Sequence, residues 1–106
     1  MIHAVYWREL HRVTVEGHAH SGEPGKDLVC AAASALALTL AENARALQGG
    51  GQARNAVADL ESGRAEISCN PASRFRAVAT VIFDGICMGF DALSRIYPDY
   101  IKYEIR

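Results

Sequence analysis

Strand-like patterns of apolar and polar residues open the chain. Residues 2–8 and 12–17 predict two strands, and residues 9–11 leave room only for a tight connection between them. Val13 and Val15 share one face of the second strand, so that face is expected to be buried. The pattern therefore predicts an N-terminal β-hairpin.

A long apolar run follows and predicts the first helix. Nearly every position in residues 28–48 is alanine, leucine or valine, so we expect this helix to be covered on most sides. Asp27 directly precedes the run and is a good N-cap. The glycines at residues 49–51 end the helix, because glycine tolerates the left-handed backbone that follows many helices.

A second hairpin pattern lies in the middle of the chain. Residues 55–61 and 64–69 predict two strands that meet at the turn-forming pair Ser62-Gly63. Residues 100–105 alternate again and predict a last strand near the end of the sequence.

The second helix is predicted from an apolar stripe with three- and four-residue intervals. Asn70 is a suitable N-cap with Pro71 at the first helical position, and Pro98 ends the helix. The stripe consists of Phe75, Val78, Ile82, Ile86, Phe90, Leu93 and Tyr97. Such a stripe indicates a helix that buries one face.

These elements follow one another in the order β-β-α-β-β-α-β. Two helices with apolar faces can both bury them by packing on the same face of a sheet. We therefore predict an α/β fold of the α+β type, a two-layer sandwich in which a mixed β-sheet carries two long helices on one face. The 106 residues form one domain in this prediction.

Composition narrows the class of protein. An apolar content of 50% and a net charge of −1 are typical of a folded, soluble chain, and the lack of a basic excess argues against direct nucleic-acid binding. Residues 75–97 are the longest apolar stretch but contain Asp84, Asp91 and Arg95, which favours a buried helix over a membrane span. Three cysteines cannot form a closed disulfide set, and no secretory signal opens the chain, so we expect a reduced, cytoplasmic setting.

Candidate chemistry is concentrated between residues 17 and 34. Cys30 falls in the first turn of the predicted helix, where unpaired amides and the positive end of the helix dipole favour a thiolate. His18 precedes it by twelve positions (30 − 18 = 12) and is a candidate general base. Cys69 and Cys87 lack such surroundings and are interpreted as structural.

The position of His18 depends on how the preceding strand ends. If strict alternation continues past Glu16, His18 lies on the same side as Glu16, away from the core. Either Gly17 breaks the alternation, or Cys30 reaches that edge of the sheet.

The same residues resemble the signature of the ribosomal-processing cysteine protease family. The similar features are the motif Gly17-His18-Ala19, a glycine-containing loop, and the run Gly25-x-Asp27-x-Val-Cys-Ala-Ala-x-Ser34. The long apolar helix that ends at Tyr97-Pro98 and the short terminal strand extend the likeness along the chain.

The resemblance implies a cysteine endopeptidase with a Cys30/His18 dyad, in which no cofactor or metal ion takes part. It implies that the substrate is the N-terminal extension of large-subunit ribosomal protein twenty-seven, cut after an aromatic residue during ribosome maturation. It also implies a homodimer. Neither a membrane nor direct nucleic-acid binding is expected.

Two polar residues are candidates for supporting roles. Asp27 orients His18 as the third member of a triad, or caps the helix, or does both, and we favour the cap. Ser34 lies one helical turn after Cys30 on the same helix face, and is expected to bond the backbone or support the site.

Backbone groups near the thiol are candidates as well. Gly22 and Gly25 are expected to let the intervening loop fold over a bound peptide as a lid, although a plain surface loop has the same composition. The amides of Cys30 and its neighbours are candidates for an oxyanion hole.

Three other hypotheses compete with the protease. His18, His20 and Cys30 together would make a plausible metal-binding set. The chain could instead be a non-enzymatic, ribosome-associated binding module with the same fold. A redox-sensing role for the thiol is the third alternative.

Overall fold

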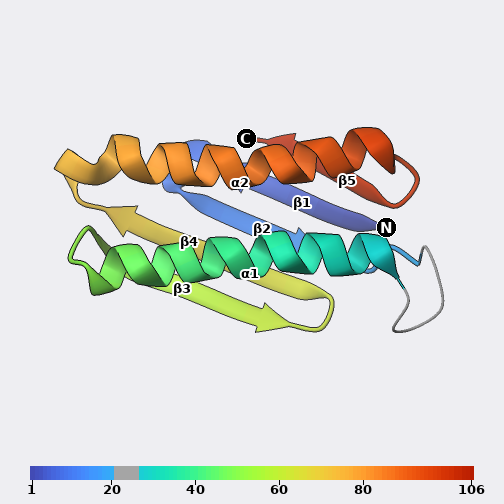
Figure 1. Ribbon diagram of the computed structural model, residues 1–106, viewed down its shortest axis with the longest axis horizontal. Coiled ribbons are helices and arrows are strands. Elements are labelled where there is room, and N and C mark those ends of the chain that lie inside the picture. Colours follow the sequence, from blue (N-terminus) through green and yellow to red (C-terminus); the bar gives the residue numbers. More distant parts are fainter. Residues whose placement is uncertain (21–26) are drawn as a thin grey trace.

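Two long helices lie side by side on one face of a five-stranded mixed sheet (Figure 1). The computed structural model describes residues 1–20 and 27–106, and the elements named here belong to that part of the chain. In chain order they are β1 (Ile2–Trp7), β2 (Arg12–Glu16), α1 (Leu28–Gly49), β3 (Ala53–Glu61), β4 (Arg64–Pro71), α2 (Arg76–Ile96) and β5 (Ile101–Ile105). The predicted order and the two-layer architecture are confirmed.

The two predicted hairpins join in the middle of the sheet. The strands lie in the order β3-β4-β2-β1-β5, and all neighbours are antiparallel except β1 and β5, which run parallel. Tyr6, Val13 and Ile67 are fully buried. Arg12 and Glu66, which alternate with these buried positions, form an ion pair at 3.2 Å and remain partly exposed. Alternation along the strands thus separates a buried face from a polar one.

Backbone and side-chain caps define both ends of α1. Asp27 Oδ1 accepts a hydrogen bond from the Cys30 amide at 2.9 Å, as expected for an N-cap. At the other end Gly51 has a left-handed φ of 73°, and its amide donates to the Gln48 carbonyl at 3.0 Å. Both predicted ends of this helix are confirmed.

α1 buries one face rather than most of its surface. Its buried residues are Val29, Ala33, Ala37, Leu40, Ala41, Ala44 and Leu47. Leu28 and Leu38, on the other side, are 79% and 51% exposed. The prediction of a helix covered on most sides is wrong, because the described part of the chain places one sheet and one neighbouring helix against it and leaves the outer side open.

The start of α2 differs from the prediction. Asn70 and Pro71 belong to β4, which pairs with β2 only as far as Ser68. The missing N–H of Pro71 therefore removes no ladder bond on that side, and the strand continues through the proline. A short 3-10 turn follows, and α2 begins at Arg76. The predicted cap and first helical residue are wrong.

The buried face of α2 overlaps the predicted stripe only in part, since Phe90 is buried while Ile82, Ile86 and Leu93 are partly buried against the core. Its buried residues are Ala79, Phe83, Cys87 and Phe90. Val78, which the stripe placed inside, is 48% exposed. Asp84 lies beside the buried face, where it accepts a hydrogen bond from the Tyr6 hydroxyl at 2.8 Å and pairs with Arg8 at 3.0 Å. These long-range bonds help set the rotation of the helix.

Among the described residues, α2 is also the most membrane-like helix. The helical segment Ser73–Ile96 is long and apolar enough to cross a membrane by length and composition alone. In the structure Phe83 and Phe90 are fully buried, and the Phe83 ring stacks on the Tyr6 ring with centroids 6.2 Å apart. These contacts place one face of α2 in the core, while Val81 and Met88 on the other side are 71% and 70% exposed.

Candidate active site

The strand that leads to His18 ends at a glycine. β2 ends at Glu16, and Gly17 has a φ of 98°. A Cβ atom at residue 17 would overlap the carbonyl oxygen of Met1, so a side chain has no room there. The Gly17 amide donates to the Gly63 carbonyl at 2.8 Å. Gly17 therefore breaks the strand alternation, which is one of the two routes expected from the sequence.

The residues after Gly17 hold the sulfur of Cys30 at the start of α1. Ala19 is buried, and its amide donates to Cys30 Sγ at 3.2 Å. The Cys30 amide donates to Asp27 Oδ1 at 2.9 Å. The cysteine is thereby tied both to the segment after β2 and to the helix N-cap, and these two contacts orient its thiol.

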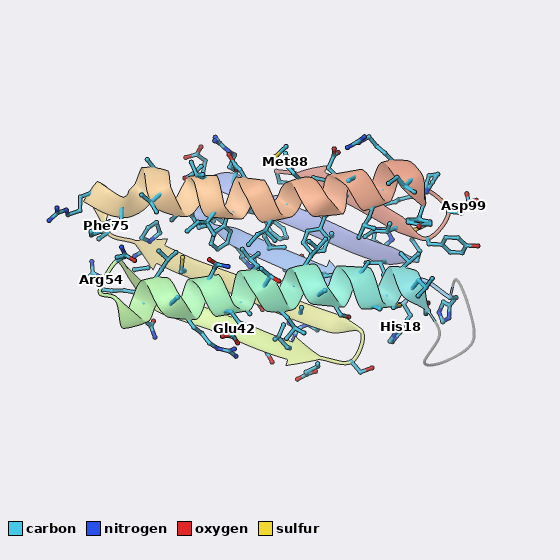
Figure 2. All side chains as sticks on the ribbon, viewed as in Figure 1. His18, Glu42, Arg54, Phe75, Met88 and Asp99 are labelled. Carbon is cyan, nitrogen blue, oxygen red and sulfur yellow. The ribbon has the colours of Figure 1, made fainter. Side chains whose placement is uncertain are left out.

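The ring of His18 lies against the turn of the β3–β4 hairpin. A Cβ atom built on Gly63 would come within 2.7 Å of His18 Nε2. Gly63 has a left-handed φ of 77°, so glycine both suits the turn and leaves room for the imidazole. The N-terminal nitrogen of Met1 donates to the His18 carbonyl at 2.6 Å. These contacts hold His18, whose side chain is exposed at this end of α1 (Figure 2).

His18 and Cys30 line the same cavity, which has a volume of about 270 Å³. Its walls come from the start of α1, the residues after β2 and the β3–β4 hairpin. Ile2 and Val15 contribute apolar surface from the sheet. The structure thus brings the predicted nucleophile and the predicted base to one cavity.

The thiol of Cys30 is not activated by its surroundings in the free protein. Burial raises its pKa above the ordinary value. The Ala19 amide lowers the pKa by donating to the sulfur, and the Asp27 carboxylate raises it, so that the net shift is upward. The predicted preference for a thiolate is therefore not met in the free protein, because burial and the capping carboxylate outweigh the lowering by the Ala19 and His20 amides. The nucleophile needs a base, and His18 shares its cavity.

The predicted supporting residues have different surroundings. Asp27 caps α1, as favoured from the sequence, while its role in orienting His18 stays a prediction. Ser34 is exposed and lines the cavity, and within the described residues its hydroxyl forms no hydrogen bond. Ser34 therefore lies at the cavity wall, and its supporting role stays a prediction. The predicted lid residues Gly22 and Gly25 lie outside the described residues.

The metal alternative gains no support from the geometry. The rings of His18 and His20 lie 5.9 Å apart, measured between their centroids. Within residues 1–20 and 27–106, no three histidine, cysteine, aspartate or glutamate side chains are grouped as a metal site requires. The set of His18, His20 and Cys30 is included in that statement.

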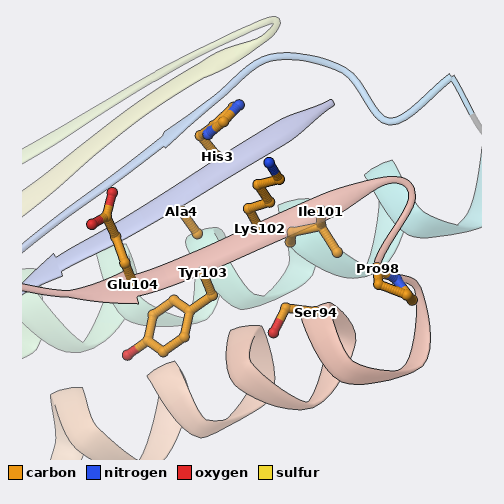
Figure 3. A pocket seen from close by; sticks show the side chains of 8 residues that line it. All are labelled: His3, Ala4, Ser94, Pro98, Ile101, Lys102, Tyr103 and Glu104. Carbon is orange, nitrogen blue, oxygen red and sulfur yellow. The ribbon is translucent and has the colours of Figure 1, made fainter.

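A larger pocket, of about 520 Å³, lies between the end of α2 and β5 (Figure 3). His3 and Ser94 both line it, but Figure 3 shows them on opposite sides of β5. The Ser94 hydroxyl donates to the Asp91 carbonyl at 2.7 Å. His3 and Ser94 are therefore not placed as a base and a nucleophile, and the smaller cavity beside Cys30 is the candidate active site.

Two contacts in the site have no clear signal in the sequence. The pattern predicts Gly63 only as a turn residue, and nothing near it in the chain shows that it faces His18. The bond from the Ala19 amide to the sulfur is equally hidden, because a backbone donor has no residue preference. The motif Gly17-His18-Ala19 is the nearest signal to both contacts.

Comparison with protein families gives one match across nearly the whole chain. The family model described as cysteine protease Prp matches residues 1–102. No curated protein sequence matches this chain.

Three solved structures share the fold. An essential ribosomal processing protease Prp from S. aureus, with a covalently linked product peptide, has a TM-score of 0.72 at 23% identity, covering 99% of this chain and 97% of that one. The S. aureus protease with a substrate peptide has a TM-score of 0.66 at 21% identity, with coverage of 99% and 97%. SMU.848 from Streptococcus mutans has a TM-score of 0.66 at 24% identity, with coverage of 98% and 90%.

Proposed function

The chain belongs to the cysteine protease Prp family, and we propose that Cys30 is its nucleophile and His18 its general base. The observation that carries this proposal is that both side chains line one cavity at the N-terminus of α1. A thiol with a raised pKa beside an imidazole suits a mechanism in which the base removes the proton when the substrate is in place.

The proposed reaction passes one proton through His18. The imidazole takes the proton from the Cys30 thiol while the sulfur bonds to the carbonyl carbon of the scissile peptide bond. His18 then gives that proton to the departing amine, and a thioester remains on Cys30. Water, activated by the neutral imidazole, hydrolyses the thioester and restores both groups.

The amide of Cys30 is an unsuitable oxyanion donor in this mechanism. It already donates to Asp27 Oδ1 at 2.9 Å. A helix start leaves further amides without an intrahelical partner, and Leu28 and Val29 are the first two residues of α1. We therefore assign the oxyanion to these two amides rather than to Cys30.

For the substrate we propose the N-terminal extension of large-subunit ribosomal protein twenty-seven, cut after an aromatic residue. The S. aureus structural neighbour is described as an essential ribosomal processing protease, in complexes with product and substrate peptides. Ile2, Val15 and Ala33 give the cavity apolar surface, which suits an aromatic side chain beside the cut.

We also propose a homodimer that works in the cytoplasm, apart from nucleic acid and membranes. Leu28, Val81 and Met88 on the helix layer are 79%, 71% and 70% exposed, which supports self-association. The net charge of −1 supports the expectation that the protein does not bind nucleic acid directly. Analytical sedimentation tests the dimer, and a monomer at every concentration would contradict it.

Cleavage of a synthetic peptide that carries the ribosomal extension tests the proposed function. The wild-type protein should cut it at one site after an aromatic residue, as read by mass spectrometry. Cys30→Ser and His18→Ala should each lower kcat/KM by about a thousandfold or more. His3→Ala is the matched control, because His3 lines the other pocket and should leave kcat/KM unchanged.

Two results would count against the proposal. Full activity in Cys30→Ser would contradict the assignment of the nucleophile. Tight binding of the peptide by a wild-type protein that never cuts it would favour the non-enzymatic binding module. The family match favours the enzyme over that alternative.

A further inference from the structure

A second cavity continues the active-site cavity along α1. Its volume is about 240 Å³. The residues that line both cavities are Ser34, Ala37, Glu61, Ser62 and Ala65. Because the two cavities share these walls, they form one continuous groove that starts at the catalytic pair.

Two leucines line the far end of this groove. Leu38 belongs to α1 and is 51% exposed, and Leu60 belongs to β3 and packs partly buried against the core. Figure 1 shows α1 running along β3 and β4, so the groove has the helix on one side and the hairpin on the other. An apolar side chain that entered here would cover the exposed surface of Leu38.

The spacing along α1 fits an extended peptide. Ser34 follows Cys30 by four residues and Leu38 follows Ser34 by four, so each step is about 6 Å along the helix axis. An extended peptide advances about 6.6 Å in two residues. Side chains two positions apart point to the same side of an extended chain. Leu38 is thus about 12 Å from Cys30 along the axis, which an extended peptide spans in about four residues, so one peptide can present two side chains on the same side to the two cavities.

We propose that the substrate peptide lies in this groove and that its far end, the Leu38–Leu60 subsite, binds an apolar side chain. That side chain is about four positions along the peptide from the residue beside Cys30. The inference rests on the proposed function, because it takes the peptide cut at Cys30 as the occupant. Continuity with the catalytic cavity is what identifies this occupant.

A cycle of enzyme and peptide substitutions tests the subsite. Each apolar peptide residue near the cut is replaced by alanine in turn, and every peptide is assayed with wild type and with Leu38→Ser. Wild type should lose about tenfold in kcat/KM for alanine at the proposed position. Leu38→Ser should lose about tenfold on the parent peptide and little more on that alanine peptide, because both changes remove one contact.

Leu10→Ser is the matched control, since Leu10 is 61% exposed and lines neither cavity. This variant should have the same kcat/KM as wild type on every peptide. Additive losses at every peptide position would overturn the subsite. Coupling confined to a peptide position far from this one would also overturn it, because the proposal fixes a spacing of about four residues.

Peptide binding to Cys30→Ala, with and without Leu38→Ser, separates this inference from the protease function. If the enzyme and peptide substitutions are coupled in binding affinity but the wild-type protein does not cut the peptide, the protease function is contradicted and the subsite is supported. Cleavage without coupling would contradict the subsite alone. A peptide that is neither cut nor bound would contradict both. If Leu38→Ser changes sedimentation but leaves peptide selectivity intact, Leu38 belongs to an interface between copies and the subsite is wrong.

Discussion

The imidazole of His18 and the turn residue Gly63 occupy adjoining space, so that a Cβ atom on Gly63 would lie 2.7 Å from His18 Nε2. The Gly63 carbonyl also accepts a hydrogen bond from the Gly17 amide at 2.8 Å. The β3–β4 turn therefore contacts both the proposed base and the residue before it. Any change of shape in this turn should move the histidine.

Gly63→Ala should lower kcat by about a hundredfold with a smaller change in KM, because an added methyl group displaces the His18 ring. The alanine is also strained by the left-handed φ of 77°, which costs roughly 1–2 kcal/mol of stability. Steady-state kinetics and urea unfolding measure the two effects.

Gly51→Ala is the matched control for that substitution. Gly51 has a similar φ of 73°, and a Cβ atom there meets no atom of the described residues within 4 Å. It should show the same loss of stability and unchanged kcat. Equal kcat in the two variants would show that Gly63 does not position His18.

Asp27→Asn should make the Cys30 thiol more reactive. Burial is the larger cause of its raised pKa, and the Asp27 carboxylate adds to it. Asparagine removes the charge and still caps a helix. Alkylation by iodoacetamide near neutral pH should therefore be faster in the variant, as read by peptide mass. An unchanged or slower rate would contradict the electrostatic role of Asp27.

The other two cysteines serve as internal references in the same labelling experiment. Cys69 and Cys87 are buried, and burial raises the pKa of Cys87 to about 12. Both should label more slowly than Cys30.

Turnover in Asp27→Asn separates the two predicted roles of Asp27. A helix cap survives this substitution, whereas loss of a triad member should lower the rate about as much as His18→Ala does.

Local patterns in the sequence predict most of the fold and the composition of the site. Helix and strand order, the Asp27 cap and the pairing of His18 with Cys30 all depend on residues close in the chain. The rotation of α2 is set in part by the hydrogen bonds that Tyr6 and Arg8 donate to Asp84, and contacts between residues so far apart in the chain leave no trace in the apolar periodicity.

The same limit explains the errors at the site. The direction in which the pKa of the Cys30 thiol shifts depends on how deeply Cys30 is buried and on the position of the Asp27 carboxylate that caps its helix. The contact between Gly63 and His18 joins residues 45 positions apart (63 − 18 = 45). Both the pKa shift and the Gly63–His18 contact depend on the three-dimensional structure and cannot be read from local sequence patterns.

The stability of the fold should fall in mild acid because of His11. Its side chain is buried and bonds to Thr80 Oγ1 at 2.8 Å, and burial, followed by the nearby Arg76, lowers its pKa. The unfolded chain therefore takes up a proton at higher pH than the folded one. The free energy of unfolding should decrease as the pH falls below about 6.5, the ordinary histidine value.

Urea unfolding at several pH values measures this effect, with His11→Asn as the control. Asparagine tolerates the left-handed φ of 47° at this position and does not titrate. As the pH falls, the free energy of unfolding of wild type should decrease more than that of the variant. A difference that is independent of pH would contradict the assignment to His11.

Two glycines in α2 should respond oppositely to alanine. A Cβ atom on Gly85 meets no described atom within 4 Å, so Gly85→Ala should stabilise the protein by about 1 kcal/mol through helix propensity. A Cβ atom on Gly89 would lie 2.7 Å from Leu36 Cδ2 of α1, so Gly89→Ala should be less stable than Gly85→Ala by about 1–3 kcal/mol. Thermal and urea unfolding measure both.

The contact between the helices can be tested in one further step. In a Leu36→Ala background the obstacle is gone, so Gly89→Ala should then be stabilising. If Gly89→Ala changes the free energy of unfolding equally in both backgrounds, Leu36 does not restrict the space at residue 89 and the proposed close contact between α1 and α2 is contradicted.

The central claim is that Cys30 forms a covalent bond to the substrate. The most direct measurement is mass spectrometry of the protein after rapid acid quenching during cleavage of the ribosomal peptide. We expect the Cys30-containing fragment to gain the mass of the acyl part of the peptide, and Cys30→Ser to show neither adduct nor cleavage. An adduct on Cys69 or Cys87, or cleavage that persists in Cys30→Ser, would contradict the account.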